Sequence, residues 1–173
     1  MLSDKMAKAI NDQINRELWS AYLYLSMSMY AENKGLKGIA NWFFIQFREE
    51  QDHARIFMNY LNARGAQVLL QPIDAVQTTW ESIAQAFADT LEHERKVTGF
   101  INGLAKLAQD ENDFASQSML RWFIDEQVEE EESVGDILNV LEQMKGMNQG
   151  LYMLDKDLAT RTYNVPSPLA NKA

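Results

Sequence analysis

Four long stretches of the chain carry apolar residues at helical spacing, and one long stretch without that spacing separates the second from the third. The segment NKGLKG breaks the first two stretches with two glycines, so they are expected to be antiparallel neighbours joined by a short link. This pattern predicts an all-α chain folded as a four-helix bundle. The predicted helices span about 4–33, 39–64, 79–108 and 113–145.

The stretch GAQVLLQPIDAVQTTW, residues 65–80, contains a proline and many β-branched residues and is predicted to be extended. About 16 residues at roughly 3.3 Å each reach about 50 Å, whereas a helix of about 26 residues is about 40 Å long. This connection can therefore cross the whole length of the bundle. A shorter helix is predicted in GLYMLDKDLATR, and the tail at 166–173 is expected to be disordered.

The composition of the chain limits the partners and metal ligands that it can use. A chain of 173 residues with 46% apolar residues suits a single domain. The formal charge of −9 argues against nucleic acid and anionic membranes as partners and leaves cations as candidates. Because the chain has no Cys, any metal must use oxygen and nitrogen ligands. The start MLSDKMAKAI does not resemble a signal peptide and no long apolar run is present, so a cytoplasmic location is expected.

Each predicted helix places one glutamate within its apolar stripe, on the side expected to face the bundle interior. All four lie near the middle of their helices and are expected at one level of the bundle. His53 follows the second of them by three residues and shares its face. The four glutamates are Glu17, Glu50, Glu94 and Glu130.

Four ionised carboxylates at one depth would repel one another strongly, so some must be protonated or bound to multivalent cations. Interhelical salt bridges are a weaker explanation, because the stripes miss Arg16, Arg48, Arg55, Arg95 and Arg121. Two divalent metals would neutralise the charge, and the Glu-x-x-His pair is typical of dinuclear carboxylate sites in bundles. Carboxylate with imidazole suits iron or manganese, and zinc competes for the same ligands.

The helix lengths, the long connection and this ligand set resemble the ferritins, specifically their non-haem bacterial branch, up to about Val165. The resemblance implies a ferritin-like di-iron domain over 1–165, with a fifth short helix, and a hollow homo-oligomeric shell of 24 subunits. It also implies two iron positions that share Glu50. The first would use Glu17, Glu50 and His53, and the second Glu50, Glu94 and Glu130.

The implied activity is that of a ferroxidase, which oxidises Fe(II) to Fe(III) with O2 or H2O2 and stores the ferric mineral inside the shell. The resemblance places Gln127 beside the second iron as a hydrogen-bonding neighbour, and Tyr24 near the pair as an electron donor. From its position alone, Tyr24 is more typical of a packed core residue.

The resemblance also implies a third iron, bound by Glu49, Glu126 and Glu129 together with Glu130. Without the resemblance, the run EQVEEEE at 126–132 fits a solvated acidic face as well as it fits a metal site.

At some positions this sequence has residues that differ from those of related families. Gln51 stands where bacterioferritins carry the haem-binding methionine, so no haem is predicted. Gln117 and Leu120 replace the acidic residues of the threefold channel of animal ferritins, which leaves the iron entry route undetermined.

A dinuclear enzyme acting on an organic substrate and a structural bundle without metal remain alternatives. His93 lies off the stripe and is expected at the surface.

Overall fold

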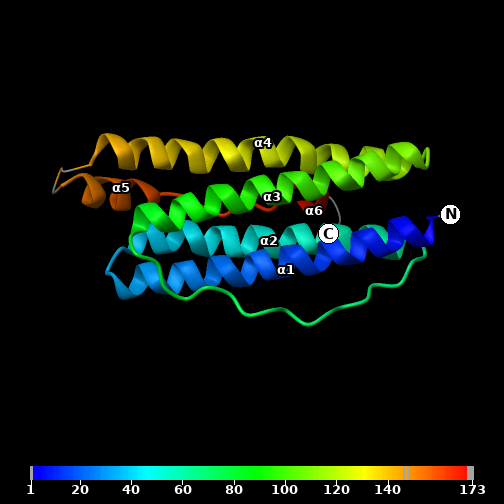
Figure 1. The fold of residues 1–173 in the computed structure, drawn as a ribbon, viewed down its shortest axis with the longest axis horizontal. Helices are drawn as coiled ribbons and strands as arrows, with labels where there is room; N and C mark the ends of the chain where they lie inside the picture. Colours follow the sequence, from blue (N-terminus) through cyan, green and yellow to red (C-terminus); the bar gives the residue numbers. More distant parts are fainter. Residues whose placement is uncertain (1, 146, 148, 171–173) are drawn as a thin grey trace.

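The computed structural model describes residues 2–145, 147 and 149–170. Four long helices form a bundle, with two short helices after it (Figure 1). This confirms the predicted all-α bundle, and the described residues contain no strand and no helix long and apolar enough to cross a membrane. The helices are α1 (Asp4–Asn33), α2 (Lys37–Ala63), α3 (Ile83–Asp110), α4 (Phe114–Gln143), α5 (Gly150–Leu158) and α6 (Ser167–Ala170).

Local capping explains where the helices begin and end. The Ser82 hydroxyl accepts a hydrogen bond from the backbone N–H of Gln85 at 3.0 Å, so α3 begins after Ser82 rather than near residue 79 as predicted. Gly35 and Gly65 follow α1 and α2 with φ of 76° and 71°, in the left-handed region that glycine adopts without strain.

The connection between α2 and α3 runs along α1 for the length of the bundle (Figure 1), as predicted. Asn11 holds its start, because the Asn11 side chain donates to the Gln67 carbonyl at 3.0 Å and accepts from the Leu69 N–H at 2.7 Å. The Tyr30 hydroxyl holds its end by donating to the Trp80 carbonyl at 2.8 Å.

The core consists of two apolar clusters separated by polar side chains. One cluster, near α5, contains Met27, Phe43 and Phe87. The other, at the opposite end of the bundle, contains Phe57 and Phe123. In every long helix, buried polar residues lie between the stretches that supply the two clusters. These residues include Glu17, Gln46, Glu50, His53, Glu94, Gln127 and Glu130.

Helix α5 docks on the start of α2. Oδ1 of Asp155 accepts from the N–H groups of Gly38 and Ile39, at 2.8 and 3.0 Å, which satisfies two free donors of the α2 N-terminus. The approach is so close that a Cβ on Gly38 would lie 1.6 Å from the Asp155 carbonyl oxygen.

Replacing Gly38 by alanine is therefore expected to displace α5 and to lower the free energy of unfolding by about 3 kcal/mol. Gly103→Ala is the matched control, because no atom lies within 4 Å of a Cβ built there. In a helix interior that change is expected to add about 1 kcal/mol. Denaturant unfolding measures both, and equal stability of the two variants would contradict the docking of α5.

After α5 the chain runs back beside α2. Tyr163 hydrogen-bonds to Asp52 of α2, and the Arg48 guanidinium carbon lies 3.6 Å from the centre of the Tyr163 ring. Helix α6 continues along α2, and Leu169 packs against the core cluster there. The last residues of the tail predicted to be disordered, 171–173, lie outside the described residues.

Candidate metal centre

The four stripe glutamates come from four different helices and are buried, each at most 5% exposed. Glu17 lies on α1, Glu50 on α2, Glu94 on α3 and Glu130 on α4. His53 is on α2 and is also buried. The heptad-like spacing of each helix therefore brings five candidate ligands into the polar section between the two apolar clusters.

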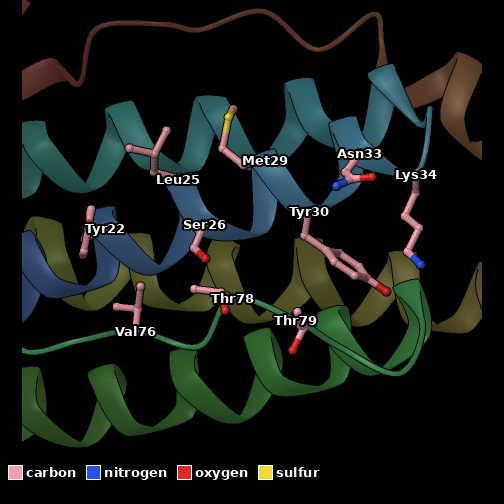
Figure 2. A pocket seen from close by; sticks show the side chains of 10 residues that line it. All are labelled: Tyr22, Leu25, Ser26, Met29, Tyr30, Asn33, Lys34, Val76, Thr78 and Thr79. Atoms are coloured by element: carbon pink, nitrogen blue, oxygen red, sulfur yellow. The ribbon is translucent and has the colours of Figure 1, made fainter.

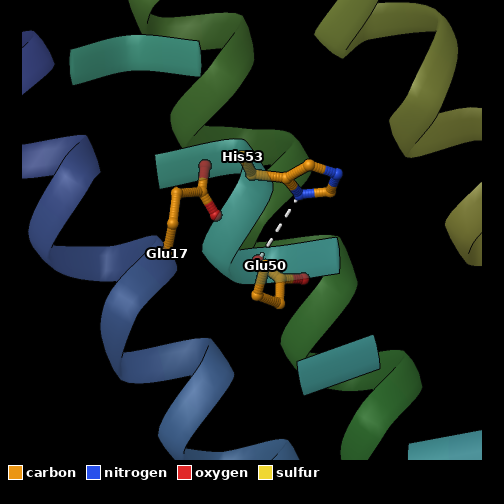
Figure 3. Close-up of side chains that lie close together, drawn as sticks. All are labelled: Glu17, Glu50 and His53. Carbon is orange, nitrogen blue, oxygen red and sulfur yellow. Dashed lines mark ion pairs between the residues drawn. The ribbon is translucent and has the colours of Figure 1, made fainter. Parts of the chain in front are cut away.

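Glu17, Glu50 and His53 form a compact group (Figure 3). One ligand atom from each lies within 4.8 Å of the others. Nδ1 of His53 is 3.5 Å from Oε2 of Glu50, since the i, i+3 spacing puts both on one face of α2. Gln13, one turn before Glu17, donates to Oε1 of Glu17 at 2.9 Å and orients that carboxylate.

His53 also belongs to a second group with Glu126 and Glu130, whose ligand atoms again lie within 4.8 Å of one another. The Gln46 amide donates to Oε2 of Glu130 at 2.8 Å. Among the described residues Glu94 joins neither group of three.

Glu94 is held from two sides instead. The Tyr24 hydroxyl donates to Oε1 of Glu94, and the Gln127 amide donates to Oε2 at 3.2 Å. Tyr24 and Gln127, singled out from the sequence, thus both lie against the same buried carboxylate.

Burial dominates the electrostatics of these carboxyls. It raises the pKa of Glu17 to about 8, with a further contribution from the charge of Glu50. Burial and the neighbouring Glu130 raise the pKa of Glu94 to about 8, and burial with Glu94 raises that of Glu50 well above its usual range. In the described part of the chain no Lys or Arg forms an ion pair with any of the four stripe glutamates.

Three buried atoms of the first group have no hydrogen-bond partner within the part of the chain that the structure describes: Oε2 of Glu17, Oε2 of Glu50 and Nε2 of His53. A buried acceptor without a partner costs about 1–3 kcal/mol, so the native structure is expected to satisfy it in another way. Carboxylate oxygens and an imidazole nitrogen are ligands that iron, manganese and zinc accept. The residues present fit a metal.

A more exposed acidic pocket of about 510 Å³ adjoins this centre. Glu49, Glu126, Glu129 and Glu130 line it, so the structure brings together the residues assigned by resemblance to a third iron. The pocket also contains Arg161, whose Nη2 lies 2.7 Å from Oε2 of Glu49. Burial raises the pKa of Glu49 to about 7, although Arg161 opposes that shift.

Sequence reasoning missed two of the residues that orient the carboxylates, Gln13 and Gln46. Gln13 precedes Glu17, to which it donates, by four residues, and this spacing was the available signal. Gln46 donates to Glu130 of another helix and carried no such signal. Arg161 had none, because its contact with Glu49 joins positions far apart in the sequence.

His93, expected at the surface, is partly exposed and lines a pocket of about 340 Å³, and one side of it packs on α1. Its Nε2 lies 2.8 Å from the Ser20 hydroxyl, and its ring is 5.4 Å from that of Trp19. Burial, with a contribution from Lys96, lowers the pKa of His93 to about 4.

Comparison with known proteins agrees with this arrangement. The family model of the ferritin-like domain matches residues 7–144. A bacterial non-heme ferritin of Staphylococcus aureus (strain MRSA252) is 37% identical over 164 residues, which cover 95% of this chain and 99% of the relative. One from Staphylococcus epidermidis is 36% identical over the same shares of both chains.

A crystal structure of an open pore ferritin from Archaeoglobus fulgidus superimposes with a TM-score of 0.93. It is 41% identical in sequence, and the match covers 94% of this chain and 100% of the other. These likenesses confirm the resemblance drawn from the sequence. The chain belongs to the ferritin family, in which its curated relatives are bacterial non-haem ferritins.

Proposed function

We propose that this ferritin stores iron, oxidising Fe(II) to Fe(III) among its buried carboxylates and depositing ferric mineral inside a hollow shell. The observation that carries the proposal is the set of four buried glutamates that have no Lys or Arg partner among the described residues, together with the ligand atoms of Glu17, Glu50 and His53 that are unpartnered there. Divalent cations would supply both the missing charge and the missing partners.

Two Fe(II) positions are proposed from the resemblance, and the compact group of Glu17, Glu50 and His53 supports the first. Glu17, Glu50 and His53 serve the first, and Glu50 is shared with Glu94 and Glu130 at the second. Hard, anionic carboxylate oxygen favours the ferric state, so these ligands assist the loss of an electron from the substrate iron. The oxidant is O2 or H2O2.

Residues around the ligands fix their positions. Gln13, Gln46 and Gln127 each donate an amide hydrogen bond to one carboxylate, which leaves the other lone pairs free for iron. Tyr24 is proposed, from the resemblance, to give an electron toward the iron pair, and its hydrogen bond to Glu94 supports that role. Because Glu17 and Glu94 have raised pKa values, binding of Fe(II) releases protons near neutral pH.

The outer acidic pocket is proposed to hold a third iron. Its position next to Glu130 joins it to the inner centre, since Glu130 lines the pocket and also belongs to a buried ligand group.

Assembly into a shell of 24 subunits is the expected state, and an exposed apolar face supports it. A groove of about 540 Å³ lies between α1 and the long connection, and Figure 2 shows the side chains that line it. Tyr22 and Met29 of α1 line it and are 51% and 52% exposed. Leu69, Leu70 and Ile73 of the connection are also exposed. Exposed apolar side chains of this kind support a surface that another subunit covers.

Anaerobic titration with Fe(II) followed by admission of O2 tests the proposal. The metal-free protein is expected to bind two or three Fe(II) per chain tightly, to develop ferric absorbance rapidly, and to behave as a large hollow particle in sizing and electron microscopy. A small particle with two sites would favour a dinuclear enzyme acting on an organic substrate. No binding would favour a structural bundle.

A further inference from the structure

Arg161 is the one basic side chain among the residues that line the outer acidic pocket, all of which the structure describes. It comes from the segment after α5, whereas the acidic residues come from α2 and α4. The proposed third metal would therefore enter a pocket that already contains a positive charge.

The guanidinium is held on two sides. Nη2 of Arg161 lies 2.7 Å from Oε2 of Glu49, and Nη1 donates to the Trp42 carbonyl at 3.2 Å. The guanidinium carbon also lies 4.9 Å from the centre of the Trp42 ring, at cation–π distance.

The backbone of Arg161 is anchored as well. The Asn41 side chain donates to the carbonyls of Leu158 and Arg161, at 3.3 and 3.0 Å. Arg161 and Glu49 are 26% and 17% exposed at their side chains, so solvent screens this pair only partly. These contacts hold the positive charge of Arg161 against Glu49 instead of leaving it free in solvent.

We propose that Arg161 is the resident cation of the outer pocket and competes with the third metal ion for Glu49. This inference rests on the proposed third site. A metal that uses Glu49 must displace the guanidinium or share the carboxylate with it. The pocket then holds its metal weakly, as suits a position that passes ions onward.

Zinc titration of the metal-free, full-length protein tests the competition, with calorimetry for affinity and native mass spectrometry for stoichiometry. Arg161→Gln is expected to bind the third Zn²⁺ about tenfold more tightly than the wild type, with the two inner ions unchanged. Arg161→Lys keeps the charge but loses the forked geometry, so its affinity is expected to be intermediate.

The Glu49→Gln background separates competition from a general effect of the tail. There, adding Arg161→Gln is expected to change third-site affinity less than about threefold, because the contested carboxylate is gone. A tenfold gain persisting in that background, or equal affinity of wild type, Arg161→Gln and Arg161→Lys, would overturn the proposal.

The same titration distinguishes a failure of the role proposed for Arg161 from a failure of the proposed dinuclear centre. Two inner zinc ions without a third in either the wild type or Arg161→Gln would overturn the role of Arg161 and leave the dinuclear centre standing. Absence of all three would overturn both.

Discussion

Replacing Glu50 by alanine is expected to lower the initial rate of Fe(II) oxidation about 100-fold or more, and replacing His53 by alanine about tenfold or more. Glu50 is shared by both proposed iron positions, so its loss disables the pair, whereas His53→Ala removes one ligand from the first position. Stopped-flow absorbance after mixing with two Fe(II) per chain and O2 measures the rate.

Gln51→Ala is the matched control, because Gln51 lies on α2 between Glu50 and His53 but is exposed. It is expected to oxidise iron at the wild-type rate. Wild-type rates in Glu50→Ala or His53→Ala, with the shell intact by sizing, would remove those residues from the proposed centre.

The metal-free protein is expected to lose stability as the pH rises from about 5 to 8. Glu17 has a pKa of about 8 in the folded chain against an ordinary value of 4.5, so between these values the folded state keeps a proton that the unfolded state releases. Stability falls with pH wherever the folded state binds more protons. At 1.36 kcal/mol per pKa unit, Glu17 alone accounts for roughly 4 kcal/mol across this window.

Glu17→Gln removes that titration. At pH 8 the metal-free variant is expected to be more stable than the metal-free wild type, while near pH 5 the two should unfold alike. Denaturant unfolding at both pH values makes the comparison, with exposed Glu132→Gln as the control that changes neither. Added Zn²⁺ should stabilise the wild type at pH 8 more than Glu17→Gln. A flat pH profile for the metal-free wild type would show that Glu17 is ionised without a metal.

Much of the fold follows from hydrophobic periodicity. The stripes of all four long helices are strong enough to predict their existence, and the length of 65–80 predicts a connection across the bundle. The predicted start of α3 was too early, because a single hydrogen bond from the Gln85 N–H to the Ser82 hydroxyl determines where this helix begins. Periodicity does not resolve an interaction of that kind.

The residues of the candidate site could likewise be predicted from the sequence only in part. Glu17, Glu50, Glu94 and Glu130 could be picked out because a charge within an apolar stripe needs a physical reason. Partners that reach the site through tertiary structure carried no such signal. Arg161 comes from a segment beyond the bundle, and only the path of that segment along α2 brings it to Glu49. For the same reason His93, off the stripe of α3, proved to be packed against α1.

Anomalous diffraction at the iron edge, from crystals soaked anaerobically in Fe(II), tests the central claim most directly. We expect one peak bound by Glu17, Glu50 and His53, and a second bound by Glu50, Glu94 and Glu130. A third, weaker peak in the outer pocket would agree with the role proposed for Arg161. Iron confined to the protein surface, with none between the two apolar clusters, would contradict the dinuclear centre.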